Sequence, residues 1–400
     1  MVIRILALAL LGAWTPLAPL PAQRGWTARL SGQGILVYTH VDPVPGGGTL
    51  SEARLVQPIL MLDLGALRQH LSLHTTADFE GWTMPHGEFA PGDWGEGYVD
   101  RRHPHTYVHE LMLTASAGPG RLNVGKGFVP FGTDDPMSRP VERYPVNHHL
   151  SQILERALLM AAVQVDRLTL EGALFNGDEP ENPGQAPNLA RFGDSWSARL
   201  TLQPAAGFEY QISTADVFSP ESRVGAGTDA RKWSTSLRAE RRAGSVSWYG
   251  LAEWARTSEA GGVFIFHSLL VEGAARTGRH QPYYRFERSE RPEDTRTLDP
   301  FRTVRPLLDN SILGIDRWSI HTVGYGVRVG AQTSPFELRP FVEGSYGRIA
   351  RVGGGVFDPA AFYGRDSFWS VTVGVRAGWG LRGHCMGHYG VPMETMDHAP

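Results

Sequence analysis

The chain has 400 residues, and its 38 lysine and arginine side chains nearly balance its 41 aspartate and glutamate side chains. This balance excludes the strongly basic surface typical of nucleic-acid-binding proteins, so we expect no nucleic acid as a partner. Beyond about two dozen N-terminal residues, no apolar run approaches the ~18 residues that a membrane-spanning helix needs. Because Cys385 is the single cysteine, the chain has no internal disulfide framework.

The N-terminal segment has the features of a secretory signal peptide. Arg4 supplies a positive charge, residues 5–14 form a short apolar core, and Pro16 breaks it. Ala22 offers a small residue for cleavage. We therefore expect residues 1–22 to be removed on export. A buried N-terminal helix is the alternative.

Residues 368–379 show the alternation of an amphipathic strand. Because alternate side chains of a strand lie on opposite faces, one face here is apolar and carries tryptophan at both ends. Such a strand is typical of a transmembrane β-barrel, where tryptophan lies at the membrane boundary. The same alternation recurs at 196–203 and 322–329. Residues 158–162 are apolar on both faces, so a helix is the alternative for the segment 150–165.

Alternation and turn residues divide the rest of the chain into about sixteen strands, with fourteen as the alternative. The expected strands lie near 27–41, 52–65, 67–79, 105–117, 120–130, 150–165, 167–176, 194–203, 207–217, 230–242, 245–257, 262–275, 281–289, 317–331, 335–348 and 366–379. Tight turns alternate with long polar loops such as 81–104 and 133–149. Outer-membrane barrels have short periplasmic turns and longer outer loops. We therefore predict an all-β fold, an antiparallel transmembrane β-barrel over residues 24–379 that contacts bacterial outer-membrane lipid.

The inner wall of such a barrel would carry three arginines, Arg199, Arg328 and Arg376. A barrel of about sixteen strands leaves an aqueous channel. Arginine on its wall favours anions. The alternative is that these side chains only pair with neighbours on the wall.

The segment Asn123 to Gly132 (NVGKGFVPFG), with residues 174–178 (LFNGD), resembles bacterial porins of the phosphate-selective porin O and P type. The resemblance implies a sixteen-stranded barrel, often a homotrimer, for passive diffusion of small hydrophilic solutes. It also implies that the third outer loop folds inward and narrows the pore. That loop is 133–149 here, and its charged residues are the predicted constriction: Asp134, Asp135, Arg139, Glu142 and Arg143. An ordinary solvated loop is the alternative.

Two groups of residues are candidate metal ligands. The tail 380–400 is expected in the periplasm if the barrel has an even number of strands and a periplasmic N-terminus. It combines thiol, thioether and imidazole groups that suit a copper ion as Cu(I). Its candidate ligands are His384, Cys385, Met386, His388, Met393, Met396 and His398. A flexible tail without metal is the alternative.

The second group consists of loop histidines. Residues 100–105, with His148 and His149, resemble a set of exported bacterial proteins associated with metal-resistance genes. If His103 or His105 meets His148 or His149, the group is a candidate for contact with a metal or an anion. Histidines that only form hydrogen bonds within the loops are the alternative. At about 3.3 Å per residue along a strand, His105 and His109 would lie roughly 13 Å apart and could not share one ion.

Motifs for enzymatic chemistry are missing from the sequence. It has no H-E-x-x-H, G-x-S-x-G, P-loop or dinucleotide-binding fingerprint, so we expect no enzyme and no cofactor apart from copper at the tail. The predicted function is a porin-like channel for small hydrophilic solutes, either general or with a preference for anions. The alternatives are an outer-membrane copper-handling protein and, as a minor one, a barrel enzyme such as a lipase.

Overall fold

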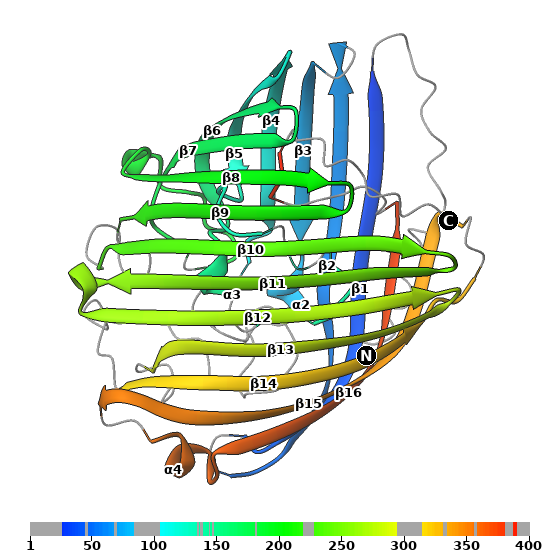
Figure 1. Ribbon diagram of the computed structural model, residues 1–400, viewed down its shortest axis with the longest axis vertical. Coiled ribbons are helices and arrows are strands. Elements are labelled where there is room, and N and C mark those ends of the chain that lie inside the picture. The colour runs from blue at the N-terminus through cyan, green and yellow to red at the C-terminus, as the bar shows by residue number, and fades with distance from the viewer. Residues whose placement is uncertain are drawn as a thin grey trace.

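The computed structural model describes residues 26–44, 47–67, 70–83, 105–133, 136, 139–143, 145, 148–180, 182–218, 228–293, 314–330, 334–355, 358–380 and 387–389. Within these residues, sixteen strands close into a single antiparallel barrel (Figure 1). Each strand pairs with its neighbours in sequence, and β16 pairs with β1 to close the ring. The predicted signal peptide lies outside the described residues. None of the described helices has the length and apolar character needed to cross a membrane.

The strands are β1 (Thr27–Asp42), β2 (Leu50–Ala66), β3 (Leu71–Asp78), β4 (Val108–Ala117), β5 (Gly120–Gly127), β6 (Arg156–Val165), β7 (Leu168–Phe175), β8 (Ser195–Ala205), β9 (Phe208–Val217), β10 (Ala230–Ala243), β11 (Val246–Glu259), β12 (Phe264–Thr277), β13 (His280–Glu293), β14 (Gly314–Val327), β15 (Phe336–Gly355) and β16 (Ser367–Trp379). The helices are short: α2 (Glu80–Thr83), α3 (His148–Ser151), α4 (Pro359–Tyr363), and the 3-10 turns η4 (Leu189–Arg191) and η5 (Ala260–Gly262). The predicted all-β barrel of sixteen strands is confirmed, and the alternative of fourteen is wrong.

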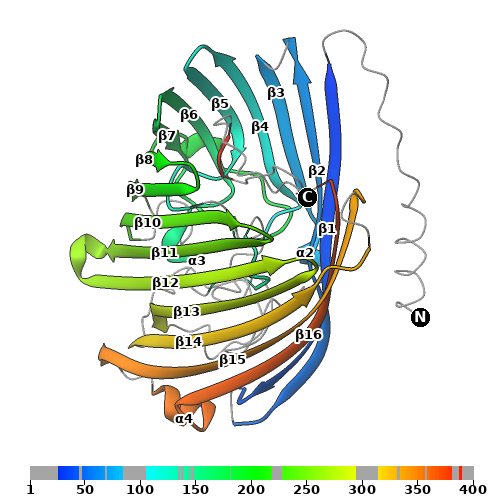
Figure 2. The same cartoon turned by 45° about the vertical axis from the view of Figure 1, so that its right-hand side comes forward.

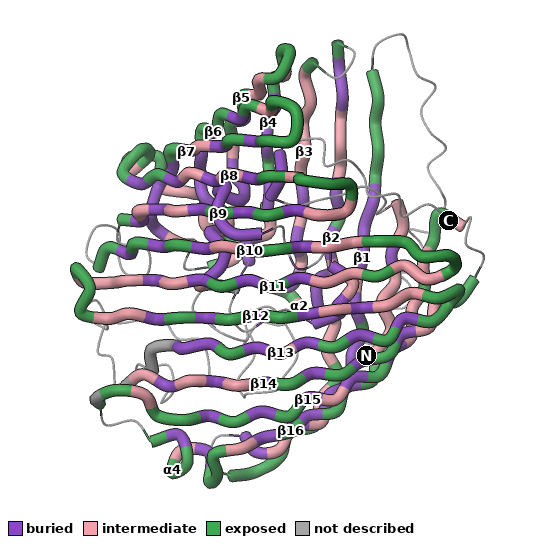
Figure 3. Tube along the Cα trace, in the orientation of Figure 1, coloured by how far each residue is buried: buried purple, intermediate pink, exposed green. Residues whose placement is uncertain are grey.

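Burial along each strand follows the alternation in the sequence (Figure 3). On β16, Val371 and Val373 are 44% and 49% exposed, whereas Ser370 and Thr372 are 2% and 1% exposed. The exposed set faces outward and is apolar, and the buried set faces the interior and is polar. An apolar exterior with a polar interior is the arrangement that a lipid-embedded barrel requires.

The chain leaves the barrel wall between β5 and β6. We expected strands over 120–130 and 150–165, but β5 ends at Gly127 and β6 begins at Arg156. The described residues between them lie inside the barrel, where the helix α3 contacts β10, β11 and β12 on the opposite wall. Figure 2 shows α3 and α2 within the ring of strands.

This inward segment explains why residues 158–162 are apolar on both faces. Leu158 and Met160 face the interior and pack in one buried cluster with Phe128, Phe131 and Ile153. The other face of β6 is exposed on the outside of the barrel. The helix considered for 150–165 is therefore wrong, apart from the single turn of α3 before the strand.

Candidate functional site: the lumen and its inward loop

The inward loop starts at a glycine whose place no other residue could take without strain. Gly132 has a φ of +67°, and a Cβ at this position would lie 1.7 Å from the carbonyl oxygen of Ser151. Its backbone N–H donates to Ser213 Oγ on β9 at 2.9 Å. The chain before it is buried, with Phe131 only 1% exposed. The porin-like segment of the sequence is thus the point where the chain turns from the wall into the lumen.

Beyond Gly132, the loop is bonded to the walls of β11 and β12. Thr133 Oγ1 donates to Glu253 Oε2 at 2.8 Å. Arg139 Nη1 donates to Glu272 Oε1 at 3.3 Å. These contacts are buried, so water does not screen them as it would on an outer surface.

The loop then reaches β15 and β16. Glu142 accepts hydrogen bonds from Arg339 Nη1 at 2.8 Å and from Arg376 Nη1 at 3.1 Å. Arg143 Nη1 donates to Ser345 Oγ at 3.2 Å and lies 3.9 Å from Glu343 Oε1. Arg139, Glu142 and Arg143 therefore lie in the barrel interior, where their role as a pore constriction stays a prediction. Asp134 and Asp135 lie outside the described residues.

Arg199 lies on the inner face of β8, and its charge is paired with a carboxylate of the neighbouring strand. Its guanidinium donates to both carboxylate oxygens of Glu171 on β7, at 2.5 and 2.8 Å. It also donates to the carbonyl oxygens of Gly132 at 3.1 Å and Gly387 at 3.0 Å. At 1% exposure it joins the wall, the loop and the tail, rather than presenting a charge to a passing ion.

The other two predicted arginines are more accessible to the lumen. Arg376 contacts Glu142, as above, and donates to Gln33 Oε1 at 2.8 Å. Arg328 follows β14 directly, at a position in line with the inward-facing residues of that strand, and is half-buried. Both arginines lie near the short turns that we assign to the periplasmic end.

Part of the C-terminal tail lies inside the barrel and not in the periplasm. Tyr389 Oη donates to Glu110 Oε1 at 2.6 Å and accepts a hydrogen bond from the backbone N–H of Phe128 at 2.7 Å. A Cβ on Gly127 would lie 2.2 Å from that hydroxyl, so glycine leaves room for it. The periplasmic placement is wrong for residues 387–389. His388 is buried there, and the remaining candidate copper ligands lie outside the described residues: His384, Cys385, Met386, Met393, Met396 and His398.

The structure contradicts the predicted separation of His105 and His109. Their rings stack with centroids 4.7 Å apart and planes 15° apart. The strand spacing fails because β4 begins only at Val108, and because its pairing with β3 skips a residue there: Thr76 pairs with Glu110 and Ala77 with Val108. The extra residue of this bulge is His109, so it faces inward beside Glu110.

A carboxylate that sequence reasoning missed completes this cluster. Asp78 Oδ2, at the end of β3, lies 3.6 Å from His105 Nδ1. Asp78 lies close to the two histidines because of the register of β3 against β4 and because of the bulge. The sequence pattern reveals neither of these features. His103 lies outside the described residues, and His148 and His149 begin α3 with side chains that are not described. Their predicted contact with His103 or His105 stays a prediction.

Glu155, between α3 and β6, anchors the returning end of the loop beside this cluster. Its Oε1 accepts from the backbone N–H of Thr106 at 2.8 Å and from Thr106 Oγ1 at 2.9 Å, and it bonds His109 Nδ1 at 2.8 Å. Burial alone would raise the pKa of Glu155, but the His109 hydrogen bond and the charges of His109, Lys126 and His105 lower it to about 2. Glu155 is therefore ionised at neutral pH.

No family model and no curated protein matches this sequence. The chain is similar to an anion-selective porin from Comamonas acidovorans, with a TM-score of 0.52 and 11% identity over 88% of this chain and 100% of that chain. It is also similar to a loop-deletion mutant of OmpT, an outer membrane protein of Vibrio cholerae, with a TM-score of 0.51 and 11% identity over 89% and 100% of the two chains.

At this identity the likeness establishes the fold alone. The fold is that of bacterial outer-membrane porins. With the apolar exterior described above, it bears out the predicted outer-membrane location. The resemblance to porins is confirmed at this level, and its narrower form, the phosphate-selective type, is not supported.

Proposed function

We propose that this protein is a porin-like channel for passive diffusion of small hydrophilic solutes, and not an enzyme. The observation that carries the proposal is a closed sixteen-stranded barrel with a polar inner wall and a charged loop in its interior. Sixteen strands enclose a space wide enough for an aqueous passage, whereas about eight strands would be filled by their own side chains. The Arg139, Glu142 and Arg143 contacts support a loop that narrows this passage.

We further propose that the channel prefers anions. Near the periplasmic end of the lumen, four arginines and three glutamates lie close enough for their charges to interact, which leaves one net positive charge in this group. Its members are Arg276, Arg328, Arg339, Arg376, Glu142, Glu240 and Glu337. Positive charge on a pore wall raises the local concentration of anions and lowers that of cations.

A planar bilayer experiment tests both parts of the proposal. We expect the purified protein to give ohmic, stepwise conductance, and a reversal potential in a potassium chloride gradient whose sign corresponds to chloride. The heat-denatured protein serves as the control. A bilayer that stays silent at high protein loading would contradict the channel. Steps with a cation-type reversal potential would contradict only the anion preference.

A homotrimer and copper binding by the tail also stay proposals. The mass of the detergent-solubilised complex tests the trimer, and a monomer mass contradicts it. For copper, full-length protein is titrated with Cu(I) beside a variant carrying Cys385→Ser and Met386→Leu. Equal uptake by the two proteins would contradict a role for these ligands.

A further inference from the structure

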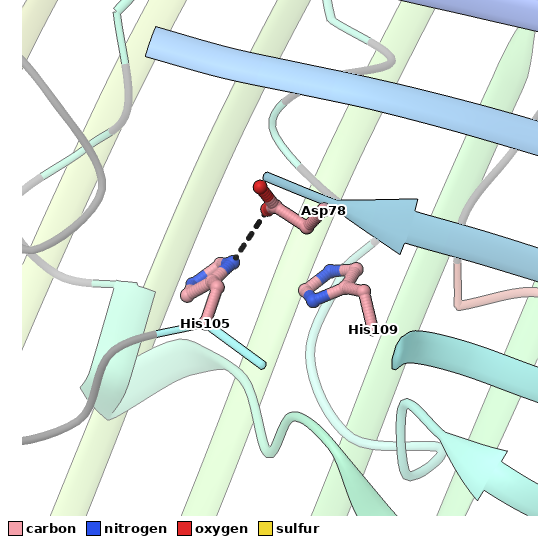
Figure 4. A group of neighbouring side chains, drawn as sticks. All are labelled: Asp78, His105 and His109. Carbon is pink, nitrogen blue, oxygen red and sulfur yellow. Dashed lines mark ion pairs between the residues drawn. The ribbon is translucent and has the colours of Figure 1, made fainter. Parts of the chain in front are cut away.

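Two histidines and an aspartate converge on one point of the lumen wall (Figure 4). One ligand atom from each of Asp78, His105 and His109 lies within 4.8 Å of the other two. The three residues are 0%, 7% and 0% exposed. They come from the end of β3, the segment before β4, and the bulge at the start of β4. Three ligand atoms from separate parts of the chain thus surround a single buried point.

His109 is oriented by a hydrogen bond on the far side of its ring. Glu155 Oε1 is already the acceptor of two hydrogen bonds from Thr106, so His109 Nδ1 donates the third. In the neutral ring, Nε2 then presents its lone pair, and it has no hydrogen-bond partner within the described part of the chain. Metal-bound histidines are commonly fixed in this way, with a carboxylate on the nitrogen that does not bind the ion.

Asp78 is held in a comparable way. Its Oδ1 accepts the backbone N–H of Glu80 at 2.7 Å, which turns Oδ2 toward His105. The 3.6 Å between Asp78 Oδ2 and His105 Nδ1 is too long for a hydrogen bond. It is close to the ~3.3 Å that separates two ligands of a tetrahedral ion with bonds of about 2.0–2.1 Å. The spacing therefore suits two ligands of one ion better than a direct hydrogen-bonded pair.

We propose that Asp78, His105 and His109 bind one divalent first-row transition metal ion of the Zn²⁺ type. Two imidazoles and a carboxylate form a ligand set of that class, whereas Ca²⁺ and Mg²⁺ prefer oxygen ligands. Three protein ligands leave a fourth position for a water molecule.

The ion joins three segments at the end of the barrel where the long loops connect the strands. It links the end of β3 to the start of β4, and through His109 and Glu155 it reaches the returning end of the inward loop. We expect an occupied site to stiffen the anchor of that loop. This site is separate from the channel proposal, because it requires the fold and not conductance.

Cobalt uptake by the full-length protein, refolded in detergent, tests the site. We expect the wild type to bind one Co²⁺ per chain, with an absorption spectrum typical of four-coordinate Co²⁺, and we expect Zn²⁺ to displace it. His105→Asn and His109→Asn abolish this binding. His280→Asn is the matched control, because His280 is exposed on β13 and bonds Tyr325 Oη, and it binds Co²⁺ like the wild type. A variant with His384→Asn and His398→Asn also retains binding, which separates this site from the tail.

Wild-type protein that takes up no Co²⁺ or Zn²⁺ would overturn the proposal, and the cluster would then be an ion-paired group of protonated histidines. Unchanged binding in both His105→Asn and His109→Asn would overturn it as well. If these two variants fail to fold, Glu155→Gln is measured instead, because it leaves all three ligands in place. Loss of the orienting carboxylate should weaken metal affinity about 10–100-fold. Unchanged affinity in that variant would contradict the assigned geometry.

Discussion

Glu142 is the point where the inward loop is bonded to two arginines of the wall, and we expect its neutralisation to increase anion selectivity. The Glu142 side chain is 0% exposed, and those of Arg339 and Arg376 are 11% and 13% exposed. Glu142→Gln keeps the size of the side chain but removes its negative charge. Because Arg339 and Arg376 are more accessible to the lumen than Glu142, the loss of its charge leaves their positive charge less compensated there. The amide keeps one acceptor oxygen, so one of the two charge-assisted hydrogen bonds is lost.

The electrostatic part of this effect can be estimated. A unit charge about 6 Å from a passing monovalent ion changes its energy by roughly 0.7 kcal/mol in water. This energy raises the occupancy of an anion about threefold and lowers that of a cation about threefold. The ratio of anion to cation permeability therefore changes about tenfold. The lost hydrogen bond to a charged group also removes about 1.5–3 kcal/mol, so we expect the contact of the loop with β15 and β16 to weaken.

The assay is the reversal potential in a potassium chloride gradient across a planar bilayer. We expect Glu142→Gln to shift it toward the chloride potential, with a smaller shift near 1 M salt, where the screening length falls to about 3 Å. Asp166→Asn is the control, because it makes the same charge change in an exposed turn between β6 and β7. A reversal potential unchanged from the wild type, or equal in the two variants, would refute the assignment of Glu142 to the ion path.

Three further predictions concern the lumen. Arg328→Glu should shift selectivity toward cations. Arg199→Glu should mainly lower the yield of folded barrel, because Arg199 is 1% exposed and its guanidinium is hydrogen-bonded to Glu171. Equal selectivity shifts in the two variants would contradict this distinction. The pKa of Glu155 is 4.5 in the unfolded chain and about 2 in the folded protein. The ionised carboxylate therefore stabilises the folded protein above about pH 4.5, and this contribution is lost as the pH falls toward 2. Melting temperatures at pH 6 and pH 3 with a chelator should differ less in Glu155→Gln than in the wild type, and equal differences would argue against this anchor. Truncation after Gly380 should raise single-channel conductance by emptying the space near Glu110, and unchanged conductance would show that the tail does not obstruct the path.

The sequence predicts the barrel well because the lipid boundary imposes a period of two on every strand. Val371 and Val373 face outward and Ser370 and Thr372 face inward, as the alternation predicts. The alternation no longer distinguishes the two faces of a strand where the interior of the barrel is also apolar. At Leu158 the inner face packs against the loop, and the sequence of one strand does not show what will fill the space opposite it.

The candidate sites are predicted less well because they depend on contacts between distant segments. The porin-like segment comes directly before the inward loop, and Arg199 is buried on the inner face of β8. Its pairing with Glu171, however, depends on the register of β7 and β8, in which the two residues are direct neighbours. The error for His109 has a similar origin, since His105 precedes β4 and a bulge turns His109 inward, so the regular rise of a strand does not apply between them.

The pairing of β1 with β16 has a consequence for how the molecule is made. Gly32 is the neighbour of Trp379, so the first strand finds its partner only after nearly the whole polypeptide has been delivered to the membrane. Until then both edge strands have unsatisfied backbone groups, which can pair with other chains. Tyr389 follows β16 in sequence and yet lies inside the barrel. Its insertion must therefore be coordinated with the pairing of β1 and β16 that closes the barrel.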